Sequence, residues 1–361
     1  MNNRRNSRGR QVLKTLLGVI GVTFLLGLAS PNSSFAQSPQ INVWYGDQQY
    51  FGEQGRTQRW VNILGNISET EKVSSLDFRI NQGELRSFSL GSDLHRLATD
   101  GDFNLELSWQ DLRIGENSVR ILLGTTDGQI LEREIKINIL PLRTWPIPYQ
   151  VDFSTEKNPQ ESVQVVDGLW HLGGTGIRTT EPYYDRVISV GDTSWTNYEA
   201  TARITIHAFT PPEKGPPTYN VTHFGMAFRW RGHTRDGRQP SRVWYPLGAQ
   251  GEFLLHPDQT TAKWRILYDG GRNAPAPSYA TKANAIAMNK PMYIKGQVRT
   301  LSDGNTRYRF KQWMEGSPEP PGWDVEGVET GARDYPSGAL CLVPHNSDVT
   351  IHELKVKPLS K

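Results

Sequence analysis

Residues 224–231 read Phe-Gly-Met-Ala-Phe-Arg-Trp-Arg. Large apolar side chains stand at every second position, and small or charged side chains stand between them. Because successive side chains of a strand point to opposite faces, this pattern predicts a β-strand with one face in a core. The same alternation recurs further along the chain, in residues 200–207, 264–268, 292–299 and 307–311. Residues 149–361 are therefore predicted to form an all-β domain.

A second set of alternating segments precedes this region, at residues 76–80, 103–109, 119–123 and 135–139. Short strands separated by turn signals over about 100 residues are typical of an immunoglobulin-like sandwich, which we expect over residues 41–140. The segment PLRTWPIP at 141–148 contains three prolines, which oppose strand pairing. It is expected to link two separately folding units.

The first 36 residues have the pattern of a signal peptide. Five basic residues precede the apolar run Leu16–Ala29, and Ser34-Phe35-Ala36 places small residues at a cleavage site. Cleavage is expected after Ala36, which predicts a secreted, periplasmic or cell-envelope protein. An uncleaved segment would be the only expected contact with a membrane.

Charge and cysteine content exclude two further classes. The segment 1–36 holds five positive and no acidic residues, so its removal changes the net charge from +3 to −2. A chain near neutrality gives no electrostatic reason to expect nucleic acid as a partner. Cys341 is the only cysteine, which excludes an intramolecular disulfide, and its apolar neighbours predict a buried thiol.

Three motifs resemble bacterial concanavalin A-like (laminin G-like) jelly-roll domains. They are the run from Arg309 through Trp313 and Glu319-Pro320 to Trp323, the block Val166-Asp-Gly-Leu-Trp170, and the ending Ser337–Ile351. The resemblance covers about 215 residues. It implies an all-β jelly-roll sandwich and says little about activity, since this fold hosts lectins, glycosidases, lyases and spacer modules.

Glycosidases of that fold commonly carry the strand motif E-x-D-x-x-E, which is missing here. The nearest segment is Asp324-Val-Glu326-Gly-Val-Glu329, with the first two residue types reversed. The eight histidines show no metal-ligand spacing. We therefore assign no catalytic residue and expect no cofactor, although the oxygen atoms of the predicted turn at Asp303-Gly304-Asn305 could bind Ca²⁺.

Aromatic and arginine residues gather in two segments, which predicts a ligand site formed by Tyr183, Tyr184, Arg229, Arg231 and Trp244. Sugars stack on aromatic rings and accept hydrogen bonds from guanidinium groups. Strand alternation would place Arg229 and Arg231 about 7 Å apart on one face. Truncating both is then expected to abolish binding and to leave the thermal midpoint nearly unchanged. The alternative is that Trp230 and Trp244 fill the core and the arginines are solvated.

Three functions remain open on this evidence. The first is a non-catalytic carbohydrate- or surface-binding protein, with a glycan or cell-surface polymer as partner. The second is a polysaccharide-active hydrolase or lyase, and the third is a structural or adhesive envelope protein. The missing carboxylate motif disfavours the second, and the aromatic–arginine segments favour the first over the third.

Overall fold

The computed structural model describes residues 38–141, 143–211, 221–244, 247–268, 275–330 and 334–360. Residues Ser38–Lys361 form one compact unit. The expected signal peptide and its cleavage site lie outside the described residues. Among the helices described, none is long and apolar enough to cross a membrane.

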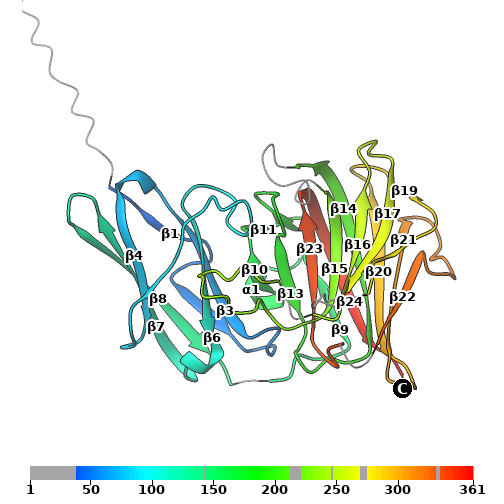
Figure 1. Cartoon of the computed structure of the whole chain (residues 1–361), viewed down its shortest axis with the longest axis horizontal. Helices are drawn as coiled ribbons and strands as arrows, with labels where there is room; N and C mark the ends of the chain where they lie inside the picture. The colour runs from blue at the N-terminus through cyan, green and yellow to red at the C-terminus, as the bar shows by residue number, and fades with distance from the viewer. Residues whose placement is uncertain are drawn as a thin grey trace, which may run out of the picture. The chain divides into compact units, whose positions relative to one another are not determined.

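The N-terminal half of this unit contains two sheets (Figure 1). A three-stranded sheet has the order β1 (Ile41–Val43), β3 (Trp60–Ile67), β6 (Asp102–Ser108). A five-stranded sheet has the order β2 (Gln48–Phe51), β8 (Ile130–Ile139), β7 (Gly115–Thr125), β4 (Val73–Ile80), β5 (Arg86–Ser87). Buried residues of both sheets share one core, so the two sheets form a sandwich, here called the N-terminal sandwich. Its membership of the immunoglobulin-like domains stays a prediction.

The C-terminal half contains two eight-stranded sheets (Figure 1). The first, the β15 sheet, has the order β10 (Gln164–Asp167), β13 (Val187–Val190), β23 (Ala339–His345), β15 (His223–Trp230), β16 (Ala249–Leu255), β17 (Thr261–Tyr268), β18 (Ser278–Tyr279), with β19 (Asn284–Ala285) also on β17. The second, the β14 sheet, has the order β11 (Trp170–Gly173), β12 (Gly176–Thr179), β24 (Ser347–Pro358), β14 (Tyr198–Phe209), β20 (Pro291–Thr300), β21 (Thr306–Met314), β22 (Val325–Glu329), with β9 (Tyr149–Asp152) on β24.

The few helical turns described are short: η1 (Thr70–Lys72), η2 (Trp109–Asp111) and α1 (Pro159–Ser162). The predicted all-β class with two sandwiches is therefore confirmed.

The core of the C-terminal sandwich lies between its two sheets, as the alternation predicts. Phe224, Met226 and Phe228 of β15 are buried in it. The Phe228 ring meets the Phe310 ring of β21 with 5.6 Å between centroids. Burying such side chains contributes roughly 1.5–3 kcal/mol each, so this interdigitated layer holds the two sheets together.

The end of the chain has the irregularity that its apolar pattern indicates. Val349 and Ile351 have one parity and Leu354 has the other, which predicts a β-bulge near Glu353. The pairing of β14 with β24 shifts register there, and His352 is the extra residue. The bulge is confirmed, one residue before the expected position. Cys341 is a free, buried thiol, also as expected.

A buried ion network joins the two sandwiches. Arg96, a buried residue, lies in the N-terminal half between β5 and β6. Its Nε donates to Asp167 Oδ1 of β10 at 2.8 Å, and its Nη1 donates to Glu106 Oε1 of β6 at 2.7 Å. Both carboxylates are buried. Separate folding of the two sandwiches stays a prediction, and this shared network is where it would be tested.

Candidate functional site

The outer face of the β15 sheet carries a row of polar side chains. Phe224 and Met226 of β15 point into the core, so alternation places the adjacent His223 on the opposite face. Leu342 of β23 points into the core in the same way, which places His345, three residues later, on the outer face. Gly251 and Phe253 face inward on β16, which turns Glu252 outward. These three polar residues are nevertheless buried, so other parts of the chain cover this face.

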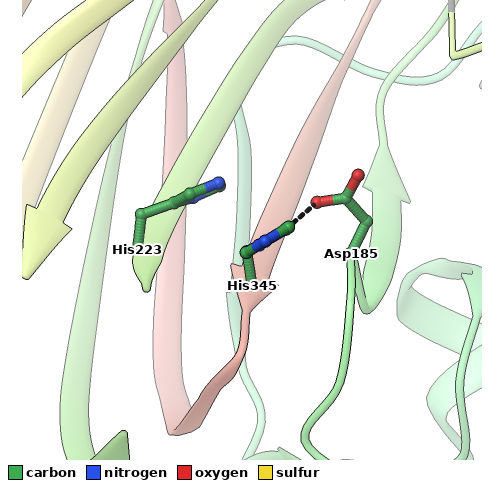
Figure 2. Close-up of side chains that lie close together, drawn as sticks. All are labelled: Asp185, His223 and His345. Atoms are coloured by element: carbon green, nitrogen blue, oxygen red, sulfur yellow. Dashed lines mark hydrogen bonds and ion pairs between the residues drawn. The ribbon is translucent and has the colours of Figure 1, made fainter. Parts of the chain in front are cut away.

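Two histidines lie next to each other on that face (Figure 2). His223 and His345 are direct partners in the antiparallel ladder between β15 and β23. Their rings stack at 4.6 Å between centroids with an interplanar angle of 10°. Figure 2 shows Asp185 on the other side of His345, where Asp185 Oδ1 lies 2.8 Å from His345 Nδ1.

Asp185 reaches this position through an unusual backbone conformation. Its φ angle is 35°, in the left-handed region that non-glycine residues seldom adopt. Hydrogen bonds from the Arg186 amide to the Pro344 carbonyl and from the Asn346 amide to the Tyr183 carbonyl tie this loop to β23. A strained residue held by surrounding bonds is a common feature of functional sites.

An acid and a base continue the row across β16 and β17. Glu252 and Arg265 are direct ladder partners, and Arg265 Nε donates to Glu252 Oε2 at 2.6 Å. Burial raises the pKa of Glu252 to about 7, although Arg265 opposes the shift. Burial, with His345 and Arg265 adding to it, holds the pKa of His223 well below its usual value. At neutral pH His223 is therefore an uncharged imidazole that can donate and accept one hydrogen bond each.

These groups line a cavity of about 620 Å³, here called the histidine cavity. Its wall also carries the Tyr184 ring, which contacts the His345 ring at 4.7 Å between centroids, and Trp244. The volume is within the roughly 300–1,000 Å³ typical of small-ligand sites. His223 Nδ1 and His345 Nε2 are buried and have no hydrogen-bond partner among the described residues. Buried polar atoms normally have one, and both of these atoms belong to residues that line the cavity.

The donor set could also hold a metal ion. One ligand atom from each of Asp185, His223 and His345 lies within 4.8 Å of the other two. Two imidazoles and a carboxylate suit Zn²⁺ or Fe²⁺, whereas Ca²⁺ prefers oxygen ligands. Nearly parallel stacked rings do not aim their lone pairs at one point, so ligation by both histidines would require one ring to turn.

The structure brings two of the five predicted site residues into this cavity, namely Tyr184 and Trp244. The adjacent Tyr183 is partly buried, and its ring is covered by the Arg186 guanidinium at 5.6 Å. It is not among the residues that line the cavity.

The two predicted arginines are separated. A bulge in β15 shifts its register against β23 between Ala227 and Trp230, and Arg229 has φ 57°. Arg229 thus turns inward, 1% exposed, and Trp230 moves to a small apolar cluster on the outer face. Arg231 lines a different cavity. The expectation that Arg229 and Arg231 share one face is wrong, because strand alternation stops at the bulge.

The acidic segment considered for catalysis does not gather its carboxylates. Alternation along β22 exposes Glu326 and buries Glu329 on the other face. Asp324 Oδ2 accepts hydrogen bonds from the Gln312 amide and the Asn284 side chain. At the predicted hairpin turn, both Asp303 carboxylate oxygens accept bonds from Asn305. Calcium binding there stays a prediction.

The histidines and Glu252 were missed because no sequence spacing connects them. They come from β15, β16 and β23, which become neighbours only through the strand order. One signal was present: His223 and Glu252 each stand at a polar position of an alternating strand. The segment before β13 was expected in the site for Tyr183 and Tyr184, and the structure adds its Asp185.

No protein-family model matches the chain, and no curated protein matches its sequence. Among solved structures, the exoplasmic/lumenal domain of VIP36 in its Ca²⁺/Man2-bound form has a TM-score of 0.35 and 12% identity, covering 54% of this chain and 80% of that one. A Bacillus subtilis protein of unknown function with a galectin-like fold has a TM-score of 0.30 and 10% identity, over 58% and 94% of the two chains.

Carbohydrate-binding modules of the β-sandwich superfamily have a TM-score of 0.19 and 9% identity, covering 89% of this chain and 97% of theirs. All three TM-scores are below 0.5. The function is therefore argued from the site and not from these likenesses.

Proposed function

We propose that this is an exported carbohydrate-binding protein without catalytic activity of its own, and that the histidine cavity is its binding site. The observation that carries this proposal is that His223 and His345, each with one buried nitrogen that has no partner among the described residues, line the same cavity as Trp244. Sugar hydroxyls both donate and accept hydrogen bonds, and their C–H faces stack on aromatic rings. The cavity offers uncharged imidazole, carboxylate, guanidinium and indole groups together.

Replacing Trp244 by alanine is expected to weaken glycan binding by about tenfold or more, since lost stacking of 1.4 kcal/mol corresponds to a factor of ten. The ligand would first be found on a glycan array with the chain from Gln37 onward. Binding would then be measured by calorimetry after EDTA treatment and after adding Ca²⁺ or Zn²⁺. Loss with EDTA and recovery with Zn²⁺ would assign the donor set to a metal.

Trp313→Ala is the matched control. Trp313 of β21 belongs to the other sheet, where its ring stacks on Tyr293 at 5.2 Å between centroids. We expect this variant to bind as the unchanged protein does. Loss of binding in Trp313→Ala alone would place the site on the β14 sheet and contradict the proposal.

Export is tested independently. N-terminal sequencing of the exported protein is expected to begin at Gln37 or within a few residues of it. A protein that retains Met1 and partitions with membranes would show an anchored chain instead.

Glu252 favours one second candidate, a polysaccharide hydrolase. A buried carboxyl with a pKa of about 7 is partly protonated at neutral pH, as a general acid must be. Asp185, which acts electrostatically on Glu252, would be the second carboxylate. Release of reducing ends by the unchanged protein but not by Glu252→Gln would establish this function and overturn the non-catalytic one.

A further inference from the structure

A second cavity, of about 700 Å³, lies where the N-terminal sandwich meets the C-terminal one. We call it the arginine cavity, because four arginines line it: Arg56, Arg59, Arg231 and Arg235. A backbone hydrogen bond connects the two sandwiches beside this cavity, because the Arg59 amide donates to the Arg231 carbonyl at 3.1 Å. It shares no lining residue with the histidine cavity.

Among the described residues that line the arginine cavity, none is acidic. None of the four guanidiniums forms an ion pair with a carboxylate of the described residues. Arg96 and Arg229 differ in this respect, because each is buried and forms an ion pair with a carboxylate. Among the described residues, Glu106 and Tyr335 act on Arg59 only from a distance, so no carboxylate is paired directly with the charge of this cavity.

Two of the guanidiniums lie over tryptophan rings. Arg56 lies 4.8 Å from the Trp109 ring centroid, and Arg235 lies 5.3 Å from that of Trp60. Stacking occupies the flat face of a guanidinium and leaves its N–H edge free to donate. Arg56 Nε is buried with no hydrogen-bond partner among the residues described. Both features prepare donors for a planar or tetrahedral anion.

The cationic groups also act on one another. Burial lowers the pKa of Arg59, and the nearby Arg231 charge lowers it further. Like charges around a cavity destabilise each other, and an anion placed between them removes that cost. Carboxylate and sulfate groups accept paired hydrogen bonds from arginine, which makes them the best-matched ligands.

We propose that the arginine cavity binds an acidic saccharide through its carboxylate or sulfate groups. The cavity size suits one or two sugar rings. This site would act beside the histidine cavity, and its occupancy does not depend on binding there.

The test measures calorimetric binding of sucrose octasulfate, digalacturonate and sucrose to the chain from Gln37 onward. The two charged probes distinguish sulfate from carboxylate recognition, and sucrose is the uncharged control. We expect at least one charged probe to bind, sucrose not to bind here, and affinity to fall as salt is added. The double variant Arg59→Gln/Arg231→Gln should weaken that binding by more than about tenfold, because it removes charge-assisted hydrogen bonds.

Arg120→Gln/Arg133→Gln removes the same charge from the exposed surface of the N-terminal sandwich. It should leave binding within about twofold, since exposed distant charges are screened. Arg59→Lys/Arg231→Lys keeps the charge but loses the paired donors of a guanidinium, so its affinity should lie between those of the unchanged protein and the glutamine variant. Such partial recovery would show that the glutamine variant loses affinity through its missing donors and not through misfolding. Trp244→Ala should bind the charged probe normally, which separates this site from the histidine cavity. Equal weakening by the surface variant, or no binding of either charged probe, would overturn the proposal.

Discussion

Replacing Arg96 by methionine is expected to lower the free energy of unfolding by about 3–5 kcal/mol, because removal of one partner leaves buried charges without compensation. Arg96 holds Asp167 and Glu106 together, and side chains of all three are 1% exposed. Burial alone would lower the pKa of Arg96, but the two carboxylates raise it. The variant would leave both acids in the protein interior, and urea denaturation measures the loss.

The control is Arg86→Met. Arg86 Nη1 lies 2.6 Å from Asp111 Oδ2, but this pair is exposed, so its loss should cost no more than about 1 kcal/mol. Adding Glu106→Gln and Asp167→Asn to Arg96→Met should restore part of the stability, since the unpaired charges are then gone. A single variant as stable as the unchanged protein would mean that water reaches these carboxylates.

The same experiment bears on the predicted domain boundary. Asp167 belongs to the C-terminal sandwich, while Arg96 and Glu106 belong to the N-terminal one. If the two sandwiches unfold in one step, Arg96→Met shifts a single transition. If the C-terminal sandwich folds independently, as the sequence predicts, the full chain should unfold in two transitions. A fragment from about Trp145 to the end should then fold alone, with Asp167 exposed to water because Arg96 and Glu106 are missing.

The fold could be predicted from the sequence because strand alternation is a local property. Phe224, Met226 and Phe228 show which face of β15 is buried, and the described structure places all three in the core. The predicted burial of alternate residues in β15 is confirmed where its pairing with β23 is regular. It failed at Trp230, because the bulge at Arg229 reverses the parity of the residues that follow it. Nothing in the residue types of that segment indicates where the register slips.

The site could be predicted only in part, because it depends on which strands become neighbours. The segment that supplies Tyr184 could be recognised from its aromatic and arginine content, but the role of Asp185 could not. His223 and His345 lie side by side because β15 and β23, which are far apart in the sequence, pair in one sheet. Pairing between distant strands produces no recognisable residue spacing in a single sequence. The stacking of the two histidines and the Glu252–Arg265 ion pair could therefore be seen only in the structure.

Arg229→Ala is expected to cost about 3–5 kcal/mol of stability, whereas a solvated ligand contact would cost almost none. Arg229 Nη1 lies 2.6 Å from Asp334 Oδ2, and both side chains are at most 2% exposed. The guanidinium also donates to the hydroxyls of Thr300 and Thr306 and to the Tyr335 carbonyl, at 2.7–2.9 Å. Its removal leaves the buried Asp334 carboxylate without its cation, with the Tyr308 hydroxyl as its remaining donor, and deprives Thr306 and Tyr335 of a donor. The thermal midpoint should fall accordingly.

Arg231→Ala is the matched control, because Arg231 is only two residues further along the chain and is partly exposed in the arginine cavity. Its midpoint should stay close to that of the unchanged protein, since exposed substitutions usually change stability by no more than about 0.5 kcal/mol. Arg229→Lys should fall between the two, because it keeps the charge beside Asp334 but loses the paired geometry. The sequence pattern predicts that the two alanine variants behave alike. Similar midpoints would restore that prediction, and a large difference would confirm that the bulge makes one arginine structural and leaves the other available to a ligand.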